Sequence, residues 1–96
     1  MELYIFARFH SHEGLEDTVY AALQSQVAAT RGERGCIAIN AFRSTRDLRL
    51  FFIHACWTDE DAFDVHAELA DTKAFVQRVE TLIDHPIDVT RTLAIA

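Results

Sequence analysis

Two residues in the middle of the chain have the chemistry of a site: Trp57 ends an apolar run, and His66 follows nine residues later. Ala62, His66 and Leu69 recur at i, i+4 and i+7, which places the histidine on the inner stripe of a predicted amphipathic helix. An imidazole among alkyl side chains needs a hydrogen-bond partner or a ligand, and near neutral pH it can take up a proton. His66 is therefore either a satisfied core histidine or a general base, and this segment alone leaves both open.

Aromatic and amide side chains elsewhere could complete a binding site around His66. Trp57 could stack on an aromatic ligand and orient one of its oxygens with the indole N–H, although a tryptophan at a strand end is more often core. Phe9 and Phe63 belong to a set of seven phenylalanines that can build a core and line an aromatic-binding cavity. Asn40 could bind a substrate carbonyl if its strand face lines the pocket, and is otherwise structural. That face also carries three further residues, Cys36, Ala38 and Phe42.

Ligand patterns for metals and cofactors are missing from the sequence. His54 with Cys56 and His10 with His12 have i, i+2 spacing, but neither pair comes with four ligands, and no C-x-x-C or H-E-x-x-H occurs. We interpret His54 as a residue of an interface between subunits. The three glycines form neither G-x-G-x-x-G nor a P-loop. We therefore expect no bound metal, flavin or haem, and we see no basic cluster near Trp57 and His66 that would favour a phosphorylated substrate.

Composition narrows the class of protein. A chain of 96 residues, 50% hydrophobic and 25% charged, predicts one globular domain spanning residues 1–96. The formal charge of −6 argues against nucleic acid as a partner, because binding phosphates requires a basic face. No apolar run approaches the roughly 18 residues of a membrane span, and the N-terminus has no signal-peptide pattern, so we expect a cytoplasmic protein. Cys36 and Cys56 are expected to be buried free thiols.

Hydrophobic periodicity predicts an α+β fold. The expected elements are a strand over 2–10, a helix over 15–31, strands over 36–42 and 48–57, a helix from 59 that breaks near 71 and resumes, and a strand over 87–95. Thr58 with Asp61 resembles a capping box at the start of the helix. The order βαββαβ is that of a ferredoxin-like domain, with an antiparallel sheet and helices on one face.

The predicted sheet has two apolar faces but helices for only one. In the strand 2–10, Leu3, Ile5 and the residues in step with them share one face, whereas Tyr4 and Phe6 lie on the other. An uncovered apolar patch of that size is unusual for a soluble monomer. We therefore expect a homodimer joined through its sheets, with Arg8 more suited to an ion pair between subunits than to substrate binding.

With these elements in place, the chain resembles the antibiotic biosynthesis monooxygenase family of dimeric α/β barrels. The matching pieces are Ala7-Arg8, Gly14, Glu33-Arg34-Gly35-Cys36, Trp57 and His66. The resemblance implies a homodimer with a pocket in each subunit between sheet and helices. For several members it also implies insertion of oxygen into aromatic or quinol-like substrates without flavin, haem or metal. Members often carry glutamate two residues before the strand-ending tryptophan, where this chain has Ala55.

The haem-degrading branch of the same superfamily is less similar. Its members place an asparagine near Ala7, a tryptophan near His66 and a histidine near Val76, and none of the three is present. Haem oxygenation is therefore not expected.

These observations favour a small cofactor-independent monooxygenase that uses molecular oxygen on a hydroxylated aromatic or quinol. His66 would deprotonate the substrate, and Trp57, Asn40, Phe9 and Phe63 would bind it. Two alternatives stay open. One is an isomerase or lyase that uses the same base without oxygen, and the other is a non-catalytic dimer that binds a hydrophobic small molecule.

Overall fold

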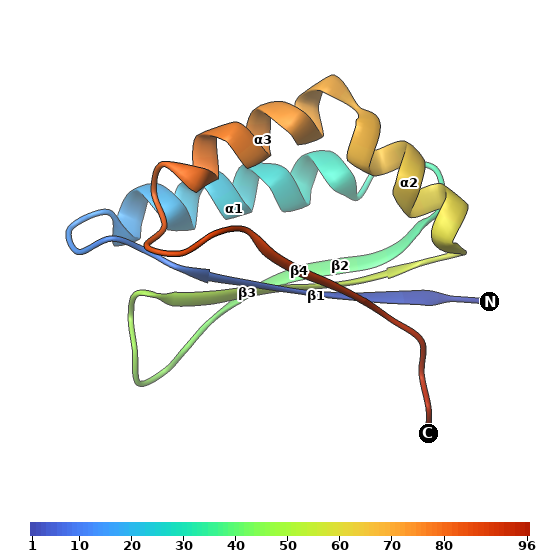
Figure 1. The fold of residues 1–96 in the computed structure, drawn as a ribbon, viewed down its shortest axis with the longest axis horizontal. Coiled ribbons are helices and arrows are strands. Elements are labelled where there is room, and N and C mark those ends of the chain that lie inside the picture. Colours follow the sequence, from blue (N-terminus) through green and yellow to red (C-terminus); the bar gives the residue numbers. More distant parts are fainter.

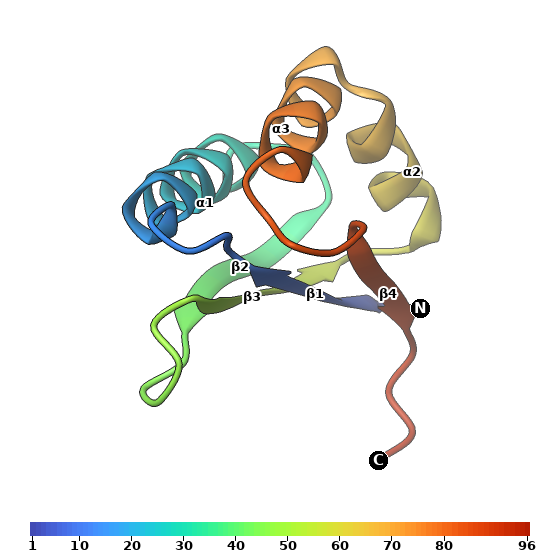
Figure 2. The same cartoon turned by 60° about the vertical axis from the view of Figure 1, so that its left-hand side comes forward.

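A computed structural model describes residues 1–96 as one four-stranded sheet with three helices (Figure 1). The strands are β1 (Leu3–His10), β2 (Cys36–Arg43), β3 (Leu50–Trp57) and β4 (Asp88–Thr92), and the helices are α1 (Glu16–Thr30), α2 (Glu60–Glu68) and α3 (Ala70–Glu80). The strand order is β2-β3-β1-β4, and all three strand pairs are antiparallel. All helices lie on one face (Figure 2). The predicted ferredoxin-like α+β fold is confirmed, with a sheet that does not close into a barrel within one chain.

The core lies between the helices and the covered face of the sheet. Alternate residues of β1 point into it, from Leu3 to Phe9, and each is buried. Helix α1 adds Val19, Leu23 and Val27 at helical spacing, so its apolar stripe faces the sheet. Trp57, the last residue of β3, is the largest fully buried side chain. None of the helices is long and apolar enough to cross a lipid bilayer.

The junction from β3 into α2 differs from the prediction. Asp59, not Thr58, caps the helix, because its carboxylate accepts the Ala62 N–H at 2.8 Å. Thr58 still belongs to the sheet end, since its N–H donates to the carbonyl of Gly35. The break between α2 and α3 falls at Leu69 rather than near Asp71, because the Leu69 backbone is extended.

Strand ends also differ from the predicted ranges. Strand β3 begins at Leu50 instead of 48, because the hairpin before it ends in a turn. Strand β4 ends at Thr92 instead of 95, and the last residues leave the sheet on the side opposite the helices (Figure 1). Leu93 and Ile95 are consequently exposed.

A β-bulge changes which face Cys36 occupies. Cys36 pairs with Trp57 and Ala38 pairs with Cys56, so one extra residue of β2 is inserted between the two pairs. The predicted grouping of Cys36 with Ala38, Asn40 and Phe42 is therefore wrong for Cys36, which lies on the helix side. The other three share the open face, because directly paired residues point the same way.

The open face of the sheet carries aromatic side chains that no helix covers. Phe6, Phe42 and Phe52 are 53%, 54% and 40% exposed. The ring of His54 packs against Phe6 with 4.9 Å between centroids and stacks on Tyr4 at 6.3 Å. The apolar patch expected on this face is thus present.

Candidate functional site

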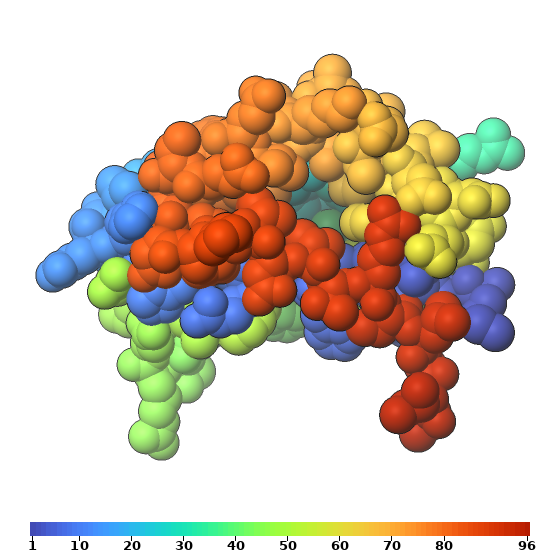
Figure 3. Space-filling model, viewed as in Figure 1, coloured from blue at the N-terminus to red at the C-terminus, as the bar shows by residue number.

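A cavity of about 320 Å³ lies between the covered face of the sheet and helices α2 and α3. Twelve of its sixteen lining residues are hydrophobic, and these twelve come from all four strands and from α2 and α3. Figure 3 shows a hollow in the surface where α2, α3 and β4 meet. Its wall includes His66, the proton acceptor that the sequence singled out.

His66 lies in the cavity wall with 7% of its surface exposed, and it is the one buried residue of α2. Its Nδ1 lies 2.7 Å from Oε1 of Glu33, and the Thr72 hydroxyl is 3.4 Å from the same nitrogen. An ionised carboxylate only accepts hydrogen bonds, so Nδ1 carries the hydrogen. In the neutral ring Nε2 is then unprotonated, and it makes no hydrogen bond within the protein. The arrangement of carboxylate and imidazole is that of a general base and its orienting partner.

The Glu33–His66 contact depends on a close approach between a loop and α2. Glu33 lies in the loop between α1 and β2, where Gly35 has φ +88°. A Cβ at Gly35 would lie 2.6 Å from the Cβ of Ala62. Two features therefore require glycine at position 35: the positive φ and the close approach to Ala62. Ala62 lies one helical turn before His66.

Trp57 contributes an unused hydrogen-bond donor. The side chain lines the cavity, 1% of it is exposed, and its Nε1 has no hydrogen-bond partner. A buried unpaired N–H costs about 1–3 kcal/mol, and this atom has no surface open to the cavity. The indole lies 4.8 Å from the His66 ring and 5.7 Å from the Phe63 ring, measured between centroids. An indole ring and an imidazole thus pack side by side in the cavity wall.

Arg91 of β4 is a cation in the cavity wall that sequence reasoning missed. Its guanidinium lies 4.8 Å from the centroid of Phe63, and its Nη1 donates to Asp64 at 2.6 Å and to Glu60 at 3.2 Å. The hydrogen bond to Asp64 raises the pKa of Arg91, so the group stays charged. Arg91 pairs with Ile5, so it lies on the helix side of β4. The alternation of residues in β4 could have predicted this only if that pairing had been known.

The structure brings four of the five predicted site residues together: His66, Trp57, Phe9 and Phe63 all line the cavity. Asn40 lies elsewhere, opposite His54 on the open face, and its side chain accepts a hydrogen bond from Arg31 at 3.0 Å. It lines a different groove of about 400 Å³ between α1 and β2. Ala55 is also in the wall of the cavity, where its methyl group keeps the surface apolar.

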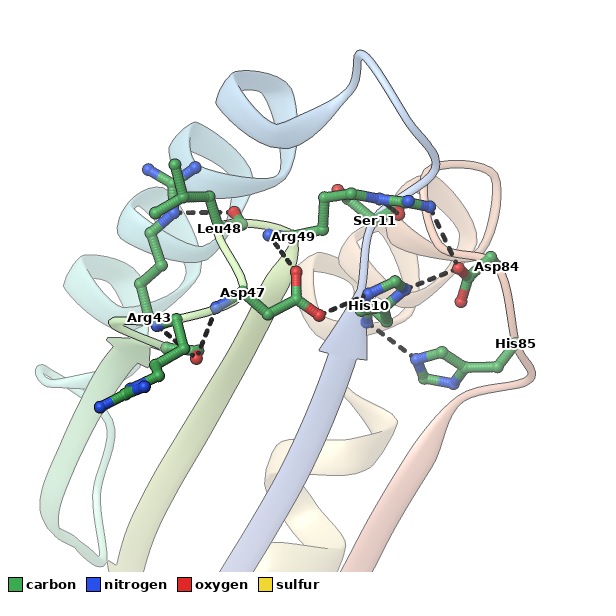
Figure 4. Close-up of polar contacts among 10 residues, drawn as sticks. His10, Ser11, Arg43, Asp47, Leu48, Arg49, Asp84 and His85 are labelled. Atoms are coloured by element: carbon green, nitrogen blue, oxygen red, sulfur yellow. Dashed lines mark hydrogen bonds and ion pairs between the residues drawn. The ribbon is translucent and has the colours of Figure 1, made fainter.

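A second polar cluster surrounds His10 at the C-terminal end of β1 (Figure 4). Its Nδ1 is 2.6 Å from Asp84 and its Nε2 is 2.9 Å from Asp47, which raises the pKa of His10. Its backbone N–H donates to His85, and Arg49 also pairs with Asp84. Both ring nitrogens are occupied by carboxylates, so the cluster joins two loops and offers no free base.

Histidines and cysteines are not gathered into a ligand set. No group of three or more histidine, cysteine or acidic side chains is arranged to hold a metal ion. His54 packs against Phe6 on the open face, and Cys36 and Cys56 lie on opposite faces of the sheet as free thiols. Cys36 is only partly buried, whereas Cys56 is buried as expected.

Solved structures of other proteins share this fold. Rv0793 from Mycobacterium tuberculosis superposes with a TM-score of 0.92 at 20% identity, covering 100% of this chain and 97% of that one. SnoaB from Streptomyces nogalater, a cofactor-independent oxygenase, superposes with a TM-score of 0.88 at 18% identity, covering 99% of this chain and 94% of that one. At these identities the likeness shows the fold.

Comparison of sequences identifies the family as well as the fold. YcnE of Bacillus subtilis, which has a provisional monooxygenase name, is 33% identical over 69 residues, which are 72% of this chain and 73% of that protein. The family model described as antibiotic biosynthesis monooxygenase matches residues 3–78, including β1, the Glu33 loop, Trp57 and His66. The chain belongs to the antibiotic biosynthesis monooxygenase family.

Proposed function

We propose that this protein is a cofactor-independent monooxygenase that oxidises a hydroxylated aromatic or quinol-type substrate in the cavity between sheet and helices. The observation that carries the proposal is the free Nε2 of His66, whose Nδ1 is fixed 2.7 Å from Glu33 in an apolar cavity. The family membership supports an enzyme of this class.

The first step is proton transfer from a substrate hydroxyl or activated C–H to Nε2 of His66. Glu33 then lies against an imidazolium, so the charge that forms on the ring is neutralised where it appears. The indole of Trp57 packs against the imidazole and supports its orientation. Burial strengthens the pairing of Glu33 with the imidazolium, because little water remains to compete.

The second step is oxidation of the anion by molecular oxygen. One electron passes from the anion to O₂, and the two radicals combine to form a carbon–oxygen bond. Cleavage of the O–O bond and departure of water, which takes up the proton held by His66, leave the new carbonyl. Overall a quinol and O₂ give a hydroxyquinone and water, so no further reductant is required.

The open face of the sheet supports a homodimer as the working unit. Its exposed phenylalanines are continuous across β1, β2 and β3, since Phe6, Phe52 and Phe42 lie on adjacent strands. We propose that a second copy covers this face, which would bury roughly 2,000 Å² or more of mostly apolar surface.

Oxygen uptake against a panel of quinols and anthrones tests the proposed function. Uptake that matches product formation one to one supports the monooxygenase. Conversion of a substrate without oxygen uptake would point to an isomerase or lyase that uses the same base. Binding with no conversion would leave a carrier of hydrophobic molecules.

A further inference from the structure

The mouth of the cavity has one permanent cation, Arg91, and most of its N–H donors are unused. Arg91 lines the cavity, but only its Nη1 bonds to protein, where it holds both Asp64 and Glu60. Its Nε and Nη2 donate to no acceptor in the chain. These are the two nitrogens along one edge of the planar group, the edge that binds carboxylates with two parallel hydrogen bonds.

The carboxylates of α2 and the ring of Phe63 hold that edge in place. Asp64 and Glu60 fix one end of the guanidinium from the solvent side, where their side chains are 56% and 62% exposed. Phe63 supports its flat face at 4.8 Å, and the same ring packs on His66 at 5.5 Å. The guanidinium is therefore positioned relative to the proposed base through a single aromatic side chain.

We propose that Arg91 is a specificity-determining residue that binds a carboxylate substituent on the aromatic substrate while His66 takes the proton from its hydroxyl. The inference rests on the proposed function and names its substrate class: hydroxylated aromatic acids. The two groups of such a ligand lie at different points of one ring system, matching a cation at the mouth and a base inside. The apolar remainder of the cavity accommodates the ring.

The acidic residues beside Arg91 do not cancel its attraction for an anion. Both carboxylates project into water, where solvent and salt screen their charges. The ligand would approach from the cavity, where the surroundings are mostly apolar and charge-assisted hydrogen bonds are stronger. Asp64 and Glu60 orient the guanidinium, and the preference for an acid comes from Arg91 itself.

A binding experiment with three matched ligands tests the proposal independently of turnover. The probes are 6-hydroxy-2-naphthoate, its neutral amide and 2-naphthol, and the readout is the dissociation constant by calorimetry with the intact protein. Wild type should bind the naphthoate most tightly. In Arg91→Gln its affinity should fall roughly tenfold to a hundredfold, the range for a charge-assisted pair, whereas affinity for 2-naphthol should stay within about twofold.

Two controls separate this role from others. Arg46→Gln changes the net charge equally in the hairpin loop away from the cavity, and should leave all three affinities unchanged. The double variant Glu60→Gln/Asp64→Asn should keep the preference for the naphthoate. If Arg91→Gln weakens all three ligands equally, Arg91 only braces α2 and the proposal is wrong. Tight naphthoate binding without any oxygen uptake would instead overturn the proposed function and leave the specificity proposal standing.

Discussion

Nδ1 of His66 and Oε1 of Glu33 lie 2.7 Å apart, although 33 positions separate the two residues in the chain. The contact determines the tautomer of the imidazole and leaves Nε2 for chemistry. A histidine that was only part of the core would have no need to keep its second nitrogen unpaired beside an apolar cavity. The pair therefore supports the proposal that His66 acts as a base.

Replacing Glu33 by glutamine should lower kcat with little effect on ligand affinity. The amide keeps a hydrogen-bond acceptor for Nδ1–H but removes the charge that stabilises the imidazolium. Loss of the acidic partner of a catalytic histidine reduces the rate by up to about 10⁴-fold, and we expect a loss of at least roughly tenfold here. Steady-state kinetics with a separate calorimetric dissociation constant measures the two effects. A fall in affinity with unchanged kcat would assign Glu33 to binding instead.

Gly35→Ala should be more destabilising than Gly14→Ala. Both glycines have positive φ, +88° and +86°, so both substitutions carry the left-handed backbone penalty of about 1–2 kcal/mol. Only at Gly35 does the new methyl group meet another atom, the Cβ of Ala62 at 2.6 Å. The difference in urea unfolding free energy should be about 1–3 kcal/mol, the cost of overpacking. Equal losses would show that the loop can move away from α2.

The His10 cluster should make stability depend on pH. Its hydrogen bond to Asp84 raises the pKa of His10, so this contribution is complete below the ordinary imidazole pKa of 6.5 and is lost as the pH rises through the higher folded value. The pKa of Asp84 is lowered by His10, so its contribution is present above 3.8 and is lost as the pH falls through the lower folded value. The pKa of Asp47 is also lowered, mostly by the hydrogen bond from the Arg49 N–H and less by His10. Its contribution to stability therefore depends on pH in the same direction as that of Asp84.

The cluster therefore stabilises most between pH 3.8 and 6.5. Thermal midpoints of wild type and His10→Gln across this range should differ by a few degrees and converge above it as His10 loses its proton. A constant difference at every pH would mean that His10 acts through packing alone.

Phe6→Asp should break the proposed dimer or leave the chain insoluble. The substitution places a charge in the middle of the open face, where a second copy would trap it without a partner. Val65→Asp is the matched control, because Val65 is 65% exposed on α2 and lines no part of the cavity. Sedimentation should give a dimer for wild type and for this control. A wild-type monomer at micromolar concentration would exclude the dimer.

Local periodicity was enough to predict the order of the elements and the inward direction of His66, because both follow from residues close in sequence. Glu33 could not be assigned as its partner, because the contact depends on how closely α2 packs against the Gly35 loop. The prediction that Asn40 shares a strand face with Cys36 was wrong for a similar reason. The bulge after Cys36 and the pairing with His54 decide its face, and neither is visible in the alternation of one strand.

Arg91 was not predicted as a site residue because it lies far along the sequence from Trp57 and His66. Strand β4 joins the sheet beside β1, which brings residue 91 to the cavity mouth from the end of the chain. Long-range strand pairing of this kind leaves little local signal.

The most direct test compares oxygen uptake and thermal stability of wild type, His66→Gln and His66→Ala with the best substrate of the panel. Glutamine retains hydrogen bonding and approximate size but cannot accept the proton. The rate per folded subunit should fall roughly 10²- to 10⁴-fold in both variants, with His66→Gln close to wild type in thermal midpoint. A contradiction would be a folded His66→Gln that keeps its rate, with a loss of about 1–3 kcal/mol of stability in His66→Ala, because His66 would then only hold the structure together.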